Sequence, residues 1–304
     1  MTRYGLDTLP TNNQNACMGR VGPRFRIGYC TSGLQGHRLG DALRLLSDLG
    51  YRGVFLTLDV HHLDPFAPDL QGRVAHTRAM LEALDLVPVV ETGARFVLDT
   101  SRKHWPNLLS VEGAERREAL LRTAIDVARD LGSPCVSMWS GENADGLPEA
   151  EAREKLRGAI ERLLGHADAA NIDLAFEPEP GMFIERIDQF LSLREDLGSP
   201  ARLKLSLDCG HLLVTGEGEP HDVVREQREL LACVAIEDMR RGVHEHIPFG
   251  EGDLELAPLV DALTEIAFEG VVAVELGRHS HEGPHQAERS KDILSALGVP
   301  FGKP

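Results

Sequence analysis

The stretch Leu174-Ala-Phe-Glu-Pro-Glu-Pro-Gly181 is a short apolar run that ends abruptly at Glu177 and two prolines. Since proline cannot continue a central strand, the pattern predicts a β-strand that ends in a carboxylate. The same pattern recurs in residues 203–208, which end in Asp208, and in residues 271–275, which end in Glu275. If the three strands are parallel members of one barrel, their carboxyl ends share a rim, and we expect the three acids to converge there.

Three converging acids need a source of positive charge. Like charges repel unless a cation or protons lie between them. We therefore predict that Glu177, Asp208 and Glu275 bind a divalent metal in the mouth of a barrel. The alternative for each acid taken singly is a structural role, in which it caps the following helix or pairs with an arginine.

Length and composition are those of one globular domain. The chain has 304 residues, 42% of them apolar, which is the size of one α/β barrel. Acids outnumber bases by 48 to 32, and the formal charge of −16 argues against nucleic acid and anionic membranes as partners. No segment reaches the about 18 to 20 apolar residues of a membrane span. The five scattered cysteines are expected to be buried thiols, so we expect a cytoplasmic protein.

Apolar strand-length runs alternate with segments of helical periodicity along the chain. Strands are predicted at residues 25–30, 53–58, 87–91, 134–139, 174–177, 203–208, 231–238 and 271–275, and helices at 39–49, 69–84, 111–131, 148–170, 183–197, 220–229, 254–267 and 284–297. Eight such pairs predict a single (β/α)8 TIM barrel over residues 25–304, after an N-terminal arm of residues 1–24. A doubly wound open sheet is the alternative, but no Gly-x-Gly-x-x-Gly follows the first strand.

Histidines near the predicted strand ends are candidates for the same site. His211 lies three residues after Asp208, where it reaches either the metal or the substrate. His244 and His246 lie two residues apart, so an extended segment points both imidazoles the same way, and we expect one of the two to complete the metal site. The alternative is a solvated histidine-rich loop.

Further polar and aromatic residues follow the second, third, fourth and seventh strands. They are expected to form the substrate wall, with bases that bind hydroxyl, carboxylate or phosphate oxygens and an indole under a sugar-like ring. The candidates are His61, His62, Glu91, Arg95, Lys103, His104, Trp139 and Arg241. Arg241 is either an anion clamp or half of a solvated pair with Arg240. Glu179 is expected to be mostly structural.

The order of Glu177, Asp208-x-x-His211, a His-x-His…Gly-x-Gly-Asp loop and Glu275 resembles the xylose isomerase-like TIM barrel superfamily, the sugar phosphate isomerase/epimerase family. This superfamily contains sugar isomerases, ketose epimerases and zinc-dependent abasic-site endonucleases, and the resemblance covers residues 25–298. It implies that Glu177 and Glu275 bind metal and move protons, while Asp208 and His211 bind metal and substrate.

One departure from the resemblance concerns the seventh strand. Ketose epimerases usually have a metal-binding histidine there, in a His-x-x-Asp pattern, where this chain reads Ala235-Ile-Glu-Asp238. In the endonuclease branch an aspartate and a histidine come from the loop before Gly-x-Gly, and counting back from Gly250 places them at His244 and His246. The resemblance therefore implies that His246, His244 or both replace the missing ligand.

The function expected from these residues is that of a metal-dependent isomerase or epimerase of a sugar, ketose or keto-cyclitol. One glutamate would remove the proton next to a metal-bound carbonyl through an enediolate, with Mn²⁺, Zn²⁺, Co²⁺ or Mg²⁺ as the cofactor. Alternatives are a phosphodiesterase of the abasic-site endonuclease kind, a dehydratase that uses nearly the same residues, and a barrel that stores metal. The sequence leaves a homo-oligomer open.

Overall fold

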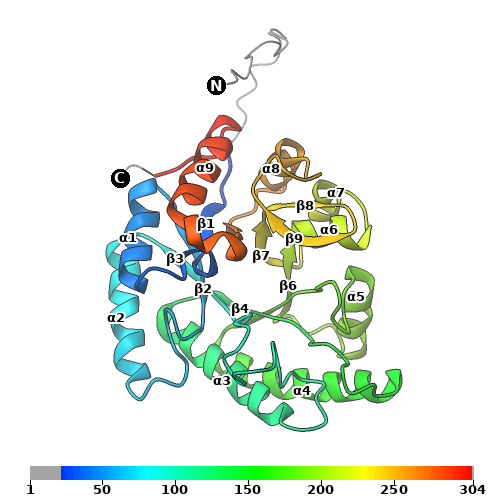
Figure 1. Cartoon of the computed structure of the whole chain (residues 1–304). Helices are drawn as coiled ribbons and strands as arrows, with labels where there is room; N and C mark the ends of the chain where they lie inside the picture. Colours follow the sequence, from blue (N-terminus) through cyan, green and yellow to red (C-terminus); the bar gives the residue numbers. More distant parts are fainter. Residues whose placement is uncertain (1–21, 303–304) are drawn as a thin grey trace.

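Eight parallel strands form a closed barrel in the computed structural model, which describes residues 22–302 (Figure 1). The predicted arm of residues 1–24 lies almost wholly outside this range. The strands follow the order β1-β10-β7-β6-β5-β4-β3-β2 around the barrel. Their bounds are β1 Arg26–Cys30, β2 Gly53–Thr57, β3 Val87–Glu91, β4 Cys135–Met138, β5 Asp173–Phe176, β6 Leu203–Asp208, β7 Leu231–Ile236 and β10 Val271–Val274.

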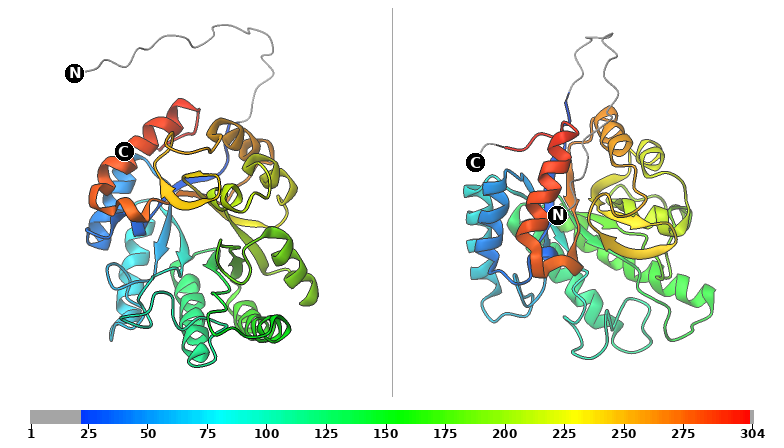
Figure 2. Two further views of the ribbon diagram at one scale, coloured as in Figure 1. Left: turned by 45° about the vertical axis from the view of Figure 1, so that its right-hand side comes forward. Right: turned by 45° about the horizontal axis from the view of Figure 1, so that its top comes forward.

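Helices form an outer ring around these strands (Figures 1 and 2). They are α1 Leu39–Leu49, α2 Leu70–Ala83, α3 Ala114–Leu131, α4 Glu149–Ala170, α5 Ile187–Asp196, α7 Pro220–Glu226, α8 Leu256–Glu265 and α9 Gly283–Ala296. The predicted single TIM barrel is thus confirmed. No helix among residues 22–302 has the length and apolar content needed to cross a membrane.

Strand side chains alternate between two apolar cores, because successive residues of a strand point to opposite faces. On β10, Val272 and Val274 pack with the helices, whereas Val271 and Ala273 belong to a smaller cluster that fills the barrel interior. The interior cluster also contains Cys30, Phe55, Val89, Cys135, Ala175, Cys233 and Ala235. The four cysteines among residues 22–302 are buried and free, as expected, and Cys17 lies outside the described range.

Short elements at the carboxyl ends of the strands depart from the predicted loops. A helix, α6 Cys209–Thr215, begins directly after β6, because both Gly210 N–H and His211 N–H donate to the Asp208 carboxylate. The segment after β7 forms an antiparallel hairpin of β8 Asp238–Arg240 and β9 Val243–Ile247. Two 3-10 helices, η1 Thr31–Leu34 and η2 Gly277–Glu282, follow β1 and β10. These elements position the side chains described next.

Candidate active site

The acids at the strand ends face the barrel interior because they continue its inward alternation. Ala175 lies in the interior cluster, so Glu177 points inward two residues later, and Glu275 follows Ala273 in the same way. Interior Val89 likewise places Glu91 inward. The strand register, rather than loop geometry, therefore brings these acids to one mouth.

A cavity of about 150 Å³ occupies this mouth. Residues after all eight barrel strands line it: Ser32, Gln35, Thr57, Asp59, Glu91, Gly93, Ala94, Arg95, Lys103, His104, Trp139, Glu177, Glu179, His211, His244, His246, Glu275, Gly277 and Arg278. Predicted metal ligands and much of the predicted substrate wall thus share one cavity. Asp208 lies among the same groups, with a fully buried side chain.

One hydrogen-bond acceptor atom of His211 faces one acceptor atom of Asp208. The Nδ1 of His211 donates to the carbonyl oxygen of Pro178 at 3.3 Å, so Nε2 carries the lone pair of the neutral ring. Nε2 lies 3.4 Å from Oδ2 of Asp208. Neither atom has a hydrogen-bond partner, since the helix-capping bonds of Asp208 use only Oδ1.

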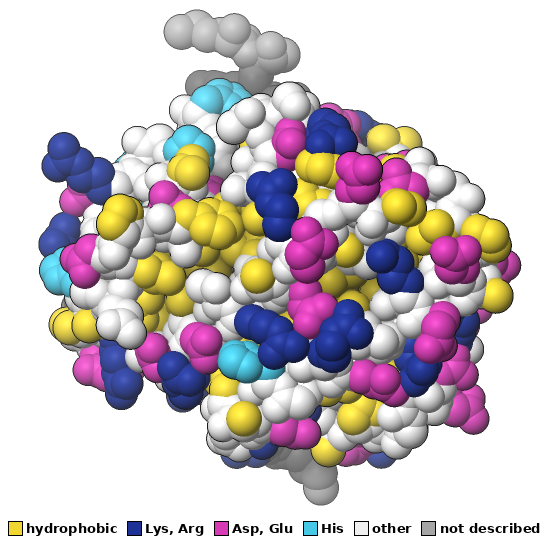
Figure 3. All heavy atoms as spheres, turned by 90° about the horizontal axis from the view of Figure 1, so that it is seen from below, with side chains coloured by type: hydrophobic (Ala, Val, Ile, Leu, Met, Phe, Trp, Pro, Cys, Tyr) yellow, Lys and Arg dark blue, Asp and Glu magenta, His cyan; other side chains and the backbone are white. Residues whose placement is uncertain are grey.

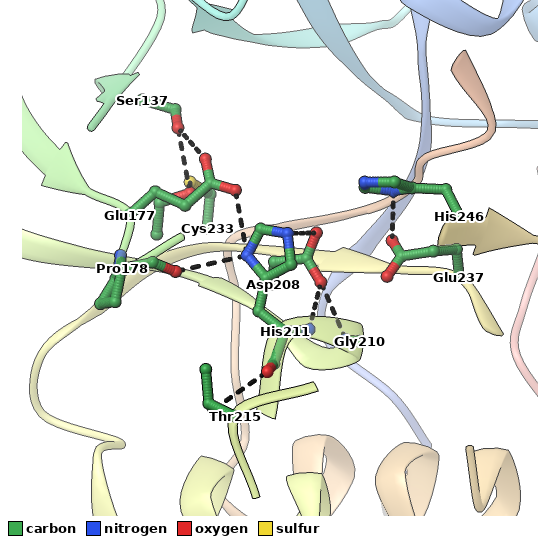
Figure 4. A network of polar contacts seen from close by, with 11 residues as sticks. Ser137, Glu177, Pro178, Asp208, Gly210, His211, Thr215, Cys233, Glu237 and His246 are labelled. Atoms are coloured by element: carbon green, nitrogen blue, oxygen red, sulfur yellow. Dashed lines mark hydrogen bonds and ion pairs between the residues drawn. The ribbon is translucent and has the colours of Figure 1, made fainter. Parts of the chain in front are cut away.

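Glu177 lies on one side of this pair (Figure 4). Its Oε2 accepts a hydrogen bond of 3.1 Å from Ser137 Oγ, and its Oε1 is 3.8 Å from Nδ1 of His211. Ligand atoms of Glu177, Asp208 and His211 lie within 4.8 Å of one another, a separation that suits a shared cation. Glu275 lines the same cavity but belongs to none of the ligand groups that meet this distance among residues 22–302.

Glu237 and His246 lie on the other side of Asp208 (Figure 4). His246 Nδ1 is 3.7 Å from Oε2 of Glu237, and these two residues form a second ligand group with Asp208. His244 and His246, both on β9, form a third group with His211, in which the His211 and His244 rings meet edge to face at 4.8 Å. The hairpin thus brings both predicted histidines to the site.

A divalent cation fits these residues. Buried Asp208 Oδ2, His211 Nε2, His246 Nδ1 and both Glu237 oxygens lack hydrogen-bond partners, although buried polar atoms are nearly always paired. Each of these oxygen and nitrogen atoms can bind a metal through a lone pair once its side chain is in the deprotonated form. Mixed imidazole and carboxylate ligands suit Mn²⁺, Zn²⁺ and Co²⁺.

Burial and neighbouring like charges shift the pKa values of these groups in the direction that favours their neutral forms. Burial, followed by the charges of Glu179, Glu275 and Asp208, raises the pKa of Glu177 well above its ordinary value. Burial and the neighbouring Glu237 do the same to the pKa of Asp208. The pKa of His211 is lowered well below its usual range by burial and by His246 and His244. Added positive charge would reverse the cost of ionising these acids.

Two further acids line the cavity and have pKa values near neutral. Burial and the charge of Glu275 raise the pKa of Glu91 to about 7, even though Gly93 N–H donates to its Oε1. Burial and Glu275 likewise raise the pKa of Glu179 to about 7. Groups that titrate near neutral pH are suited to proton transfer.

The outer part of the cavity carries basic and aromatic groups. Arg95, Lys103 and Arg278 line it, and the His104 ring meets the Trp139 ring edge to face at 5.0 Å. Burial lowers the pKa of His104 to about 3, with Lys103 as the next cause, so this imidazole is neutral. The cavity therefore combines an acidic floor with a cationic rim.

Three predicted substrate residues do not line this cavity, and one of them, His61, is exposed after β2. His62 is buried beside a separate hollow between α1 and α2, because it turns away after Asp59. Arg241 is at the turn of the β8–β9 hairpin, where its guanidinium binds the Glu219 carboxylate at 2.7 Å. The interpretation of Arg241 as an anion clamp is thus not supported by its position, since an acid already binds it.

Two residues of the cavity region were missed or misjudged from sequence. Glu179 was expected to be structural, but it lines the cavity, because residues two apart in an extended segment point the same way. Glu237 was passed over as part of a missing histidine motif. The inward alternation of Cys233 and Ala235 was the signal that could have identified it.

The order of these groups along an eight-stranded barrel can be compared with known families. Residues 43–297 match the model of the xylose isomerase-like TIM barrel family. The chain belongs to this family. The predicted resemblance is thereby confirmed, and the family match spans every barrel strand from β2 to β10.

Several known proteins are similar to this chain over most of their length. The L-ribulose-5-phosphate 3-epimerase of Shigella flexneri serotype 5b is 24% identical over 251 residues, 80% of this chain and 84% of that protein. A D-allulose 3-epimerase of Methylomonas sp. in complex with D-allulose has a TM-score of 0.67 and 20% identity, covering 90% of this chain and 98% of that one. The IOLI protein with a zinc atom has a TM-score of 0.70 at 14% identity, covering 90% and 98%. At these identities the structural likeness shows the shared fold.

Proposed function

We propose that this chain is a divalent-metal-dependent isomerase that epimerises a ketose or a closely related keto-cyclitol. The observation that carries the proposal is that Glu177 and Glu275 line one cavity together with His211 and His246, whose Nε2 and Nδ1 atoms lack hydrogen-bond partners. The similarity to an L-ribulose-5-phosphate 3-epimerase supports a ketose or its phosphate as the substrate. The formal charge of −16 supports it further, and on the face drawn in Figure 3 Lys and Arg are interspersed with Asp and Glu and form no continuous basic surface.

Glu177 and Glu275 are the proton carriers in this proposal. Their strands, β5 and β10, are separated by β6 and β7 around the barrel, so the two carboxylates approach the cavity from different sides. One removes the proton from the carbon next to the carbonyl, and the other returns a proton to the opposite face. Ser137, which donates to Glu177, orients that carboxylate.

Glu177, Asp208 and His211 would hold the proposed cation, with His246, His244 and Glu275 as the further ligands expected from the sequence. When bound, it supplies Lewis-acid polarisation of the carbonyl and stabilises the enediolate charge. His211 keeps its Nε2 lone pair directed at the site because Pro178 holds Nδ1.

The far end of the substrate meets the cationic rim. Arg95 and Lys103 line the cavity without an ion pair to any acid among residues 22–302 within 4.0 Å, so their charges are available to phosphate or hydroxyl oxygens. Trp139, buried beside the same cavity, supplies an apolar face for the sugar carbons. We expect a phosphorylated ketose to bind more tightly than its free sugar.

Proton exchange tests the proposal directly. The full chain with Mn²⁺ is incubated in deuterated water with L-ribulose 5-phosphate, D-allulose and an inosose, and proton NMR follows the carbon next to each carbonyl. We expect deuterium at that carbon and the appearance of the epimer. Loss of water from the substrate would instead indicate a dehydratase, and no exchange with any of them would refute the proposal.

A matched pair of variants tests whether Lys103 at the cationic rim binds the substrate phosphate. Lys103→Gln should raise KM for the phosphorylated ketose by about tenfold, the effect of losing one charged hydrogen bond, while the free sugar is little affected. Lys155→Gln, on the outer helix α4, should change neither value. Equal KM changes for both sugars would remove Lys103 from phosphate binding.

A further inference from the structure

Arg117 is a buried cation that no carboxylate neutralises. It lies in the first turns of α3 and is 2% exposed. No acid among residues 22–302 lies within 4.0 Å of its guanidinium, and burial alone lowers its pKa, to about 10. The side chain therefore still carries its charge at neutral pH. Because a buried charge is costly unless other groups compensate it, the contacts that this guanidinium does make are informative.

The guanidinium of Arg117 contacts two parts of the substrate wall at once. One is the rim loop, residues 92–113, which connects β3 to α3 and carries two of the three cations of the cationic rim. Nε of Arg117 donates to the carbonyl oxygen of Pro106 in this loop at 3.0 Å. The other part is Trp139, whose ring centroid lies 4.8 Å from Cζ of Arg117, within the range of a cation–π contact.

Trp139 is enclosed by these neighbours. It follows β4, is 6% exposed and lines the cavity. His104 of the rim loop meets its ring edge to face at 5.0 Å. Because the Arg117 guanidinium covers one face of the indole, a substrate in the cavity can meet only the rest of the ring. The orientation of this indole therefore depends on Arg117 and on the rim loop.

The rim loop is fixed to its surroundings by side-chain donors. Arg116, the neighbour of Arg117 on α3, donates to the carbonyl oxygen of Leu98. Asn107 Nδ2 donates to the carbonyl oxygen of Glu142, which follows β4, at 2.9 Å. Of these three donors within residues 22–302, Arg117 is the one that also lies over a ring of the cavity. A planar guanidinium suits both tasks, because its edge donates hydrogen bonds while its face stacks on an aromatic ring.

We propose that Arg117 is a positioning residue for substrate binding, which holds the Trp139 indole and the rim loop in the orientation that receives the ketose. The inference rests on the proposed function, because that function places the ketose beside Trp139. Arg117 is not among the residues that line the cavity, so it acts through Trp139 and the loop rather than on the substrate. Its effect should therefore appear in binding and not in proton transfer.

Fluorescence of Trp139 tests the contact without turnover. The chain has two tryptophans, so Trp105→Phe leaves Trp139 as the only one. In this background Arg117→Met should shift the emission maximum and increase quenching by acrylamide, because the indole loses the cation over its face. Arg129→Met, on the same helix and paired with Asp126 at the surface, should change neither. Unchanged emission and quenching in a folded Arg117→Met would overturn the inference.

Steady-state kinetics separates positioning of the substrate from chemistry. With L-ribulose 5-phosphate, Arg117→Met should raise KM by about tenfold and leave kcat within about twofold of its original value. Arg117→Lys keeps the charge and a donor, so it should recover part of this loss. A fall in kcat at constant KM, or a loss as large in Arg117→Lys as in Arg117→Met, would contradict a positioning role.

The lysine variant also guards against loss of the fold. If circular dichroism shows that Arg117→Met is unfolded, Arg117→Lys alone must alter the Trp139 emission and raise KM by a smaller factor. Emission and KM both equal to those of the unaltered protein would then count against the inference.

Direct binding distinguishes this inference from the proposed function. Calorimetry gives Kd for L-ribulose 5-phosphate whether or not the ketose turns over. A chain whose Kd and Trp139 emission both respond to Arg117→Met, but which exchanges no proton, retains the positioning residue and loses the function. A chain that exchanges the proton, with KM and emission indifferent to Arg117→Met, retains the function and loses the positioning residue.

Discussion

Glu118 and Glu177 are two glutamates of nearly equal exposure, with side chains 16% and 15% exposed, in opposite surroundings. Glu118, on α3, accepts hydrogen bonds from Arg122 and from Arg162 of α4. Glu177 receives one hydrogen bond, from Ser137, and has other acids as neighbours. The Arg162 hydrogen bond lowers the pKa of Glu118, whereas burial raises that of Glu177.

The difference shows where the fold neutralises its acids by itself. On the helical surface an arginine of the same chain supplies the counter-charge, and the acid contributes to stability. At the mouth of the barrel the chain leaves acids unpaired, at a cost in stability that only a cation or a proton from outside can remove. Unpaired buried acids of this kind mark functional sites.

The largest effect is expected from removing the proton carriers. Glu177→Gln and Glu275→Gln should each lower the rate of proton exchange by about 10²–10⁴-fold, because an amide cannot accept the substrate proton. The exchange rate in deuterated water measures the loss, and circular dichroism checks the fold. Glu118→Gln is the matched control, and an equal loss of activity there would remove the distinction between the two glutamates.

Cation binding should stabilise the protein through Asp208. At a Mn²⁺ concentration of about 100 times Kd, binding contributes about 2.7 kcal/mol, which raises the Tm of a chain of this length by about 4 °C. Asp208→Asn keeps the Oδ1 acceptor that begins α6 but replaces the free Oδ2 with an amide, so this gain should largely disappear. Thermal melts with Mn²⁺ and with a chelator measure it.

The melts have a control at the other end of the barrel. Asp173→Asn should gain as much from Mn²⁺ as the unaltered protein, since Asp173 pairs with Arg202 and lies at the start of β5. A full Mn²⁺ gain in Asp208→Asn would show that the mouth acids are not the ligands.

Glu91 should make the chelated protein less stable as pH rises. Its pKa is raised from 4.5 to about 7, so the folded state holds this proton more tightly than the unfolded state does. Its contribution is therefore lost as pH rises from about 4.5 to about 7, by on the order of 1–3 kcal/mol. Urea unfolding of Glu91→Gln should show a smaller decline over this range than the unaltered protein, and parallel declines would contradict the assignment.

Much of this site was predictable because the end of each strand, and the alternation of strands and helices that predicts a barrel, can be read directly from the sequence. Glu177 and Glu275 end recognisable apolar runs, and the barrel rule brings them together. Glu237 was missed because the end of its strand was compared only with the His-x-x-Asp motif of the family, from which it departs. The hairpin that carries His246 was predicted only as a loop. Arg241 was misplaced because its partner, Glu219, belongs to a segment that only the folded chain brings near.

The smallest effect is expected at Glu118, and its sign should be opposite to that at Glu91. The pKa of Glu118 is lowered by the hydrogen bond from Arg162, so its contribution to stability is present above the ordinary glutamate pKa and is lost as pH falls through the lowered value. Glu118→Gln should lower the free energy of unfolding by about 1 kcal/mol at pH 7, because a partly exposed ion pair contributes little.

The pH dependence separates this surface acid from the mouth acids. In urea unfolding the difference between Glu118→Gln and the unaltered protein should shrink toward zero as pH falls through the lowered pKa of Glu118, below which both proteins carry a neutral side chain at this position. Metal stoichiometry and the exchange rate should not change. A difference that grows as pH falls would mean that Glu118, like Glu91, is held in its neutral form, and the contrast between arginine-paired and unpaired acids would then fail at its simplest example.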